Sequence, residues 1–247
     1  MIVASSCPVF KKRSTLHRPP RSVLSRPGAK IESAVEDKAV MSEVKRICVF
    51  CGSASGIKPE YEAVAAALGE HMVQQGIGLV YGGGTVGLMG VIGRTVFKGL
   101  GDEGVIGIIP ESLTPKEVSG EMIGTLQIVE DMHTRKALMA KHADGFIAMP
   151  GGFGTMEELM EVLTWQQLGF HSKPVGLLNI AGFYDPLVSF FKHCVDEGFV
   201  KAQYNAVIVS SDPAELIQKM REFKAPESII GRRLREKGPD GIDVSTH

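Results

Sequence analysis

Apolar residues gather in seven short runs along the chain, separated by stretches in which apolar positions recur at helical spacing. The runs cover residues 46–51, 78–82, 104–110, 125–130, 144–150, 174–179 and 205–210. Short apolar strands that alternate with helices are typical of a parallel sheet buried on both sides. The pattern therefore predicts a doubly wound α/β fold, with a parallel sheet of about seven strands and helices on both faces.

The two ends of the chain lack this periodicity. Residues 1–30 contain seven Lys or Arg and no acidic residue, which is typical both of a disordered extension and of an organelle transit peptide. Met41 offers a second start. We expect residues 1–43 to form such an extension, residues 44–225 to fold as one domain, and residues 226–247 to form a tail.

Composition and charge exclude several classes of protein. With 247 residues, of which 44% are apolar, the chain can bury one substantial core. Without the basic N-terminal residues, 20 basic residues face 28 acidic ones, so sequence-independent binding of nucleic acid is not expected. No apolar run is long enough to span a membrane.

The four cysteines, Cys7, Cys48, Cys51 and Cys194, are too few for a disulfide scaffold and are typical of cytosolic thiols. Cys48 and Cys51 form a CxxC within an expected strand, where positions three apart point to opposite faces. No second CxxC or paired histidine completes a zinc site. We therefore predict buried structural cysteines and no metal.

Glycine-rich loops follow three of the expected strands, at the edge of the sheet where ligands of such folds bind. In the second loop, YGGGTVGLMG, the residues Gly82, Gly84 and Gly87 match the dinucleotide pattern GxGxxG. A dinucleotide site also needs an acid at the end of the next strand, and Glu111 lies too far along, beyond Pro110. Tight turns and close helix packing explain these glycines equally well.

The third loop, PGGFGTMEE, carries more information. Its glycines let the backbone turn, and Thr155 is the expected N-cap of the following helix, whose free N–H groups favour a phosphate. The spacing of Thr155 and Glu158 matches a capping box, which explains Glu158 without any chemistry. It leaves Glu157 unexplained.

Two carboxylates beside a phosphate site disfavour a purely anionic ligand. They suit a ligand that becomes partly positive during reaction, such as a nucleoside monophosphate that loses its base through an oxocarbenium-like state. A carboxylate can also orient the attacking water or accept its proton.

The stretch before the fifth strand supplies cations. Arg135 can bind phosphate oxygens or stabilise charge on the departing base, and Lys136 lies beside it. The alternative is an ordinary solvated basic turn. His133 and His142 are candidates for acid–base roles or for structural ones.

The helix after the third loop carries an apolar stripe at helical spacing. Its members are Met156, Leu159, Met160 and Leu163, flanked by Val162 and Trp165. Such a helix is either deeply buried or packed across a symmetric subunit interface. We favour the interface, with core packing as the alternative.

Several motifs in order resemble the LONELY GUY family of cytokinin-activating phosphoribohydrolases, whose marker is PGGxGTxxE. They include CGSASG, YGGGTVGLMG, MHTRK, PGGFGTMEE and LTWQQLGFHSKPVGLLN, and the similarity runs from about Arg46 to Asp212. The resemblance implies a Rossmann-like sheet, no organic cofactor and a homodimer with sites near its interface. It also implies hydrolysis of N6-prenylated AMP to the free base and ribose 5-phosphate, in the cytoplasm and the nucleus, or in a plastid or mitochondrion if the N-terminus is a transit peptide. An older label for relatives, lysine decarboxylase, finds no pyridoxal-type lysine context here.

The resemblance also implies site residues. Arg135 and Glu158 correspond to the catalytic pair. Nucleotide contacts correspond to Glu117, Arg135, Lys136, Gly152, Phe153, Gly154, Thr155, Met156, Glu157, Glu158 and Thr164. Two positions depart from the family pattern, since Phe153 replaces a common tyrosine and Glu111 a usual basic residue.

Three classes of function remain open on the sequence: a phosphoribohydrolase, a nucleotide-binding or carrier protein without turnover, and an NAD-type oxidoreductase. Only the second glycine loop favours the oxidoreductase. The adjacent carboxylates of the third loop favour the hydrolase, because a protein that only binds phosphate gains nothing from them.

Overall fold

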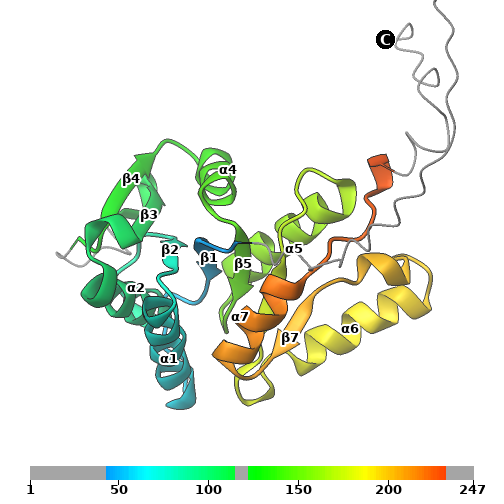
Figure 1. Ribbon diagram of the computed structural model, residues 1–247, viewed down its shortest axis with the longest axis horizontal. Coiled ribbons are helices and arrows are strands. Elements are labelled where there is room, and N and C mark those ends of the chain that lie inside the picture. The colour runs from blue at the N-terminus through cyan, green and yellow to red at the C-terminus, as the bar shows by residue number, and fades with distance from the viewer. Residues whose placement is uncertain (1–42, 115–121, 232–247) are drawn as a thin grey trace, which may run out of the picture. The chain divides into compact units, whose positions relative to one another are not determined.

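The computed structural model describes residues 43–114 and 122–231 (Figure 1). The predicted parallel sheet is confirmed, and each strand begins and ends within three residues of its expected run. The strands are β1 (Arg46–Phe50), β2 (Gly78–Tyr81), β3 (Val105–Pro110), β4 (Thr125–Val129), β5 (Gly145–Ala148), β6 (Val175–Leu178) and β7 (Ile208–Ser210). The predicted extension (1–43) and tail (226–247) fall largely outside the described residues.

The strand order places a switch point in the middle of the sheet. The order is β4-β3-β2-β1-β5-β6-β7, with every pair parallel. The chain proceeds from β1 outward to β4 and then returns to β5 beside β1, where Ile47 lies between Leu79 and Gly145. Such a reversal opens a crevice at the carboxyl ends of the two central strands.

Helices cover both faces of the sheet, as predicted. The helices α1 (Glu60–Gln74), α2 (Gly87–Leu100) and α7 (Pro213–Glu222) pack on one face, and α4 (Met132–His142), α5 (Phe153–Leu168) and α6 (Asp185–Asp196) pack on the other. Short 3-10 turns cover Asp102–Gly104, Glu111–Leu113, Ile180–Gly182 and Ala202–Tyr204. Figure 1 shows α1 and α2 on the side of the sheet opposite to α4.

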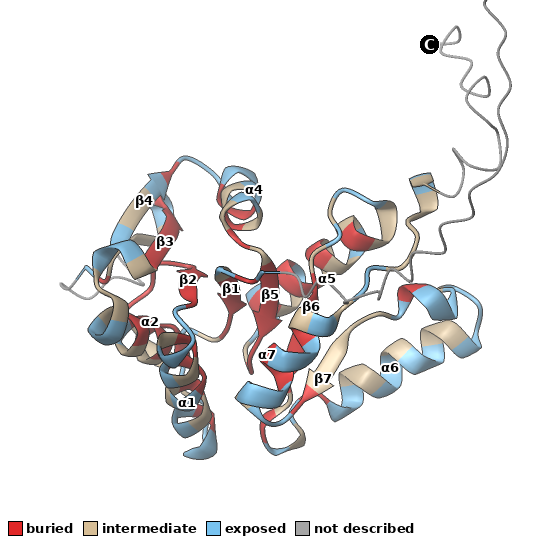
Figure 2. Ribbon diagram, viewed as in Figure 1, coloured by how far each residue is buried: buried red, intermediate tan, exposed pale blue. Residues whose placement is uncertain are grey.

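Alternating side chains of the strands fill two separate cores. Ile47 and Val49 pack towards α1 and α2, whereas Cys48 and Phe50 pack towards α4 and α5. The five inner strands are accordingly buried almost throughout, whereas the edge strands β4 and β7 are largely of intermediate exposure (Figure 2). Cys51 belongs to the first core and Cys48 to the second, both as free thiols, which confirms that they point to opposite faces.

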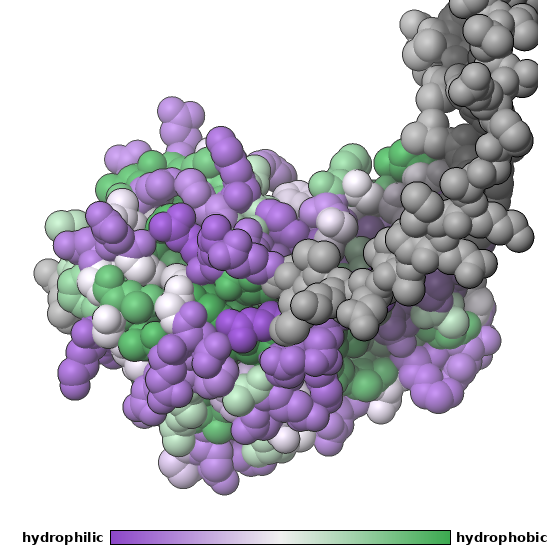
Figure 3. Space-filling model, viewed as in Figure 1, coloured by the Kyte–Doolittle hydropathy of each residue, from purple (hydrophilic) through white to green (hydrophobic). Residues whose placement is uncertain are grey.

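The surface carries hydrophilic and hydrophobic residues. On the face shown in Figure 3, hydrophilic residues surround smaller areas of hydrophobic ones. Among the described helices, none is long and apolar enough to cross a membrane. Among the described α-helices, α6 is the one without a buried residue, so that it is tan and pale blue in Figure 2.

Candidate active site

The three glycine loops join at Gly52, directly after β1. The N–H of Gly52 donates to the carbonyl of Pro150 at 3.0 Å, and its own carbonyl accepts from the N–H groups of Leu88 and Met89 at 3.1 and 3.3 Å. Together with α4, the loops enclose a cleft of about 340 Å³ at the carboxyl ends of β1, β2 and β5. The sequence correctly placed the loops that bound it.

The third loop enters its helix earlier than the capping interpretation requires. α5 begins at Phe153, its N-cap is Gly152, and Thr155 lies inside the first turn. The predicted N-cap role of Thr155, and with it the capping box to Glu158, is wrong. The physical reason is that the glycines let the chain take up helical geometry before Thr155. The buried hydroxyl of Thr155 lies where a Cβ on Gly151 would be.

The start of α5 is open for an anion. The first backbone hydrogen bond of the helix runs from the N–H of Met156 to the carbonyl of Gly152, at 3.1 Å, so the preceding N–H groups have no acceptor within the helix. A Cβ placed on Gly152 or Gly154 would meet nothing within 4 Å. The backbone is therefore accessible to a ligand at the positive end of the helix.

Arg135 and Glu158 lie next to each other inside the cleft. Asp131 caps α4 by accepting from the N–H of Thr134 at 2.8 Å, and this hydrogen bond lowers the pKa of Asp131. The side chain of Arg135 then points inward, with Nη2 3.7 Å from Oε1 of Glu158. Both residues are buried, at 6% and 8% exposure. The interpretation of Arg135 as part of a solvated turn is wrong.

The second loop makes room for this arginine. A Cβ on Gly82 would overlap Nη2 of Arg135. On the other side, Nη1 of Arg135 lies 3.7 Å from the sulfur of Met132, while Nε is buried without a partner among the described residues. The guanidinium thus has little freedom to move away from Glu158.

Gly87 of the second loop serves close packing. Gly87 has a φ of +56°, and a Cβ there would overlap the backbone of Ser53. Glu111 is exposed in the 3-10 turn after β3. These positions fit the packing interpretation of GxGxxG better than a dinucleotide site.

The structure places some of the expected site residues in the cleft and others outside it. Those that line the cleft are Arg135, Gly152, Phe153, Gly154, Thr155 and Glu158. Lys136 and Glu157 form an ion pair outside it, and Thr164 lines a different groove. Met156 packs against the core under α5, and Glu117 lies outside the described residues. The nucleotide contacts expected of these five residues stay predictions.

The sulfur-rich wall of the cleft was not predicted from the sequence. Met89, Met132 and Met139 line it, with Leu113 and Cys51. Methionine at helical spacing cannot be told from ordinary core packing without coordinates. Burial, and then the charge of Glu158, raise the pKa of the Cys51 thiol, so that it stays protonated and is not a nucleophile at neutral pH.

The two histidines near Arg135 lie outside the cleft. His133 is exposed on α4, and His142 lies at the other end of that helix beside Arg46 and Asp144. Within residues 43–114 and 122–231, no three His, Cys, Asp or Glu side chains are grouped so as to hold a metal ion.

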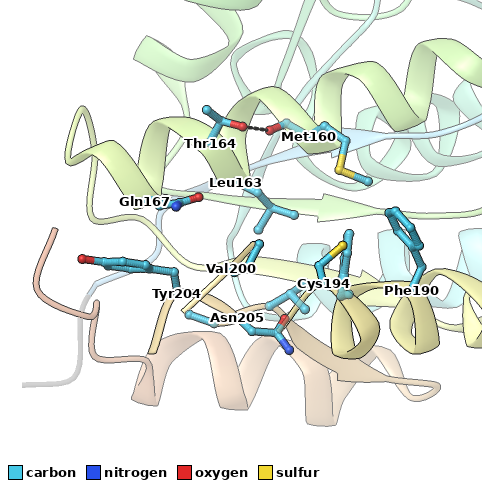
Figure 4. A pocket seen from close by; sticks show the side chains of 12 residues that line it. Met160, Leu163, Thr164, Gln167, Phe190, Cys194, Val200, Tyr204 and Asn205 are labelled. Atoms are coloured by element: carbon cyan, nitrogen blue, oxygen red, sulfur yellow. Dashed lines mark hydrogen bonds between the residues drawn. The ribbon is translucent and has the colours of Figure 1, made fainter. Parts of the chain in front are cut away.

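A second, apolar groove of about 190 Å³ runs between α5 and α6 (Figure 4). It divides the predicted stripe of α5, because Leu159 and Val162 are buried in the core whereas Met160 and Leu163 line the groove. Phe190 of α6 lines the opposite wall and is 56% exposed. The core-packing alternative therefore holds for Leu159 and Val162, and the subunit interface stays a prediction.

A parallel sheet with a switch point, an open helix start for phosphate and a buried carboxylate beside it define a Rossmann-like protein built for nucleotides. A protein-family model described as "possible lysine decarboxylase" matches residues 89–220. The chain is 52% identical to the cytokinin riboside 5'-monophosphate phosphoribohydrolase LOG1 of Arabidopsis thaliana, over 74% of this chain and 86% of the relative. It is also 52% identical to LOG of Oryza sativa subsp. japonica, over 77% and 78% of the two chains. The chain belongs to the family of cytokinin riboside 5'-monophosphate phosphoribohydrolases.

Solved structures agree with the fold. A molybdenum cofactor binding protein from Rippkaea orientalis superposes with a TM-score of 0.54 at 25% identity, covering 73% of this chain and 97% of the other. The Moco carrier protein of Chlamydomonas reinhardtii gives 0.55 at 22% identity, covering 73% and 97%. The second likeness shows the fold alone. The decarboxylase label finds no support in the cleft, since its described lining contains no lysine.

Proposed function

We propose that the protein hydrolyses the N-glycosidic bond of cytokinin riboside 5'-monophosphates, releasing the free base and ribose 5-phosphate. The observation that carries this proposal is the buried Glu158 carboxylate, 3.7 Å from Arg135, in a cleft that starts at an open helix N-terminus. With the capping box excluded, the position of Glu158 needs a different explanation, and catalysis provides one.

The 5'-phosphate binds at the start of α5. The N–H groups of Phe153, Gly154 and Thr155 donate to its oxygens, and the helix dipole adds to the attraction. This anchor places the ribose within the cleft, towards Glu158. Holding the substrate in this way supplies much of the orientation that the reaction requires.

Glu158 acts on the ribose. As the bond from C1' to the base breaks, C1' becomes cationic and the carboxylate stabilises it. Water adds its oxygen to C1' and gives a proton to the carboxylate, while the electron pair of the broken bond stays on the base. Arg135 stabilises that negative charge until the base takes up a proton.

The base and its N6 substituent occupy the apolar wall of the cleft. Met89, Met132 and Met139 present polarizable thioethers, which adapt to a flexible isoprenoid chain. Such a wall binds the substituent without a directional contact, which favours prenylated AMP over plain AMP by the burial of apolar surface.

We further propose a homodimer that uses the groove between α5 and α6. Thr164 lies ten residues beyond Gly154 on the same helix, which is about 15 Å along the axis. Thr164 lines the groove and not the cleft of its own chain, so we propose that it serves the cleft of a second copy. The groove that it lines is apolar, as dimer interfaces are at their centre. The compartment stays a prediction.

Product analysis tests the reaction. The purified chain is incubated with isopentenyladenosine monophosphate, AMP and the unphosphorylated nucleoside, and bases are separated by chromatography. We expect free base from the prenylated monophosphate, less from AMP and little from the nucleoside. Tight binding of the monophosphate without products would instead indicate a carrier.

Two variants test the site within the same assay. Glu158→Gln and Arg135→Ala should each lower turnover by about 100-fold or more while the circular dichroism spectrum shows that the fold is kept. A Glu158→Gln variant that turns over normally but unfolds at lower temperature would show that the carboxylate is structural.

A further inference from the structure

Two adjacent residues of α4 pair with two adjacent residues of α5. Inside the cleft, Arg135 lies against Glu158, with 3.7 Å between the charged atoms. Outside the cleft, the ammonium of Lys136 forms a close ion pair with Glu157. Glu161, one turn further along α5, approaches the same ammonium to 3.1 Å. The two helices, both labelled in Figure 1, are therefore joined by an inner and an outer ion pair.

The outer pair has a buried lysine and two more exposed carboxylates. The Lys136 side chain is only 9% exposed, whereas those of Glu157 and Glu161 are 51% and 24% exposed. Burial alone lowers the pKa of Lys136, but the hydrogen bonds to the two carboxylates outweigh it and raise the pKa. A charged ammonium in such a place needs its partners, because an unpaired buried charge is strongly destabilising.

Lys136 bonds to both carboxylates at once. Its ammonium donates one hydrogen bond to Glu157 and one to Oε1 of Glu161 at 3.2 Å, while Oε2 of Glu161 lies 3.1 Å away. None of the three residues lines the cleft. For a direct contact with the nucleotide, Lys136 would have to leave this arrangement.

We propose that Lys136, Glu157 and Glu161 form a clamp that positions α4 against α5 and thereby holds Arg135 at Glu158. The inference rests on the proposed function, because it assigns these residues to the same reaction. The residues of the clamp are positioning residues. Lys136 is the direct neighbour of Arg135, and Glu157 is the direct neighbour of Glu158. A shift of the outer ion pair therefore also displaces the inner one. A misplacement of about 1 Å can cost about 100-fold in rate.

The clamp also accounts for the second carboxylate of the loop. Glu157 pairs with Lys136 and Glu158 with Arg135, so the adjacent acids have different partners on α4 and, we propose, separate roles. Glu158 meets the reacting sugar and Glu157 fixes the helix that carries the arginine.

A mutant cycle with turnover and binding tests the clamp. The variants are Lys136→Met, Glu157→Gln, the double variant Glu157→Gln/Glu161→Gln and the triple combination. We expect Glu157→Gln alone to stay within about threefold of the wild-type kcat, since Glu161 still pairs with the lysine. The double variant and Lys136→Met should each lose about tenfold in kcat with KM and the calorimetric Kd for the monophosphate nearly unchanged. The triple variant should be no worse than Lys136→Met, because the clamp acts as one unit.

A matched control removes two charges elsewhere. Glu62→Gln/Glu70→Gln changes two exposed glutamates of α1 and should leave kcat unchanged. The clamp is overturned if Glu157→Gln alone loses as much rate as Glu158→Gln, or if Lys136→Met weakens nucleotide binding tenfold while the glutamate variants behave as wild type. A wild-type protein without turnover would contradict the proposed function instead. In that case the same variants are compared by thermal unfolding. If their losses of unfolding temperature are additive, the clamp is overturned.

Discussion

Gly82 shows how a residue without a side chain can control a catalytic one. It lies beneath the Arg135 guanidinium, and a Cβ at this position would overlap Nη2 and come within 3.1 Å of the sulfur of Met89. Its φ is not among the positive values of the chain, so alanine fits the backbone there. The requirement for glycine is therefore the space that the arginine takes.

The Gly82→Ala variant should consequently lose activity through Arg135. We expect kcat to fall by about tenfold to 100-fold, since the guanidinium must move away from Glu158, as measured by release of free base. Gly145→Ala is the matched control, because a Cβ there meets the flexible end of Met220 at 2.8 Å, far from the cleft. Normal turnover in Gly82→Ala would show that this glycine does not set the position of Arg135.

Single residues also mark where sequence reasoning fails. The spacing of Thr155 and Glu158 is that of a capping box, but spacing does not say where a helix begins. The preceding glycines let α5 begin at Phe153. In the same way, Arg135 and Lys136 were both expected to contact the nucleotide, but their neighbouring positions on α4 direct Arg135 into the cleft and Lys136 to the clamp.

At the scale of elements, His171 ties the end of α5 to the start of β6. Its Nδ1 accepts from the N–H of Lys173 at 3.1 Å, so the ring is neutral and its Nε2–H donates to the carbonyl of Val162 at 2.9 Å. The ring also packs on Phe146 of β5, with 5.2 Å between centroids. Burial is the main cause that lowers the pKa of His171, and the charge of Lys173 adds to it.

This contact predicts a pH dependence of stability. Because the folded pKa lies below the ordinary value of 6.5, the stabilisation is complete above that value and is lost as pH falls through the folded pKa. The difference in unfolding free energy between the wild type and His171→Gln should therefore shrink between pH 7 and the more acidic range. Urea denaturation at a series of pH values measures it, and a difference that stays constant would contradict the role of the ring.

The order of the strands and helices could be predicted, whereas the way in which they pack against one another could not. Apolar runs predicted each strand of the described residues, because the inner strands of a parallel sheet are buried on both faces and need no alternation. The stripe of α5 was visible as well, but it divides between the core and the groove. Periodicity identifies an apolar surface and does not say which element covers it.

At the scale of the whole molecule, the groove between α5 and α6 predicts how copies of the chain associate. α6 has no buried residue, and Phe190 is 56% exposed on the wall of the groove, facing Met160 and Leu163 of α5 (Figure 4). An exposed apolar groove of this kind is typical of an interface between proteins. A second copy that covers it buries the same surface on both partners.

Phe190→Glu should therefore separate the subunits. Light scattering should give twice the chain mass of 26.6 kDa for the wild type and the single mass for the variant, because a carboxylate at the centre of an apolar interface loses its hydration. If Thr164 serves the cleft of the second copy, KM for the monophosphate should rise as well. Ile128→Glu is the control, since Ile128 is 60% exposed on β4, at the opposite edge of the sheet from β7. A monomeric Phe190→Glu variant with wild-type kcat and KM would show that one chain completes its own site, and a dimeric variant would show that the copies meet elsewhere.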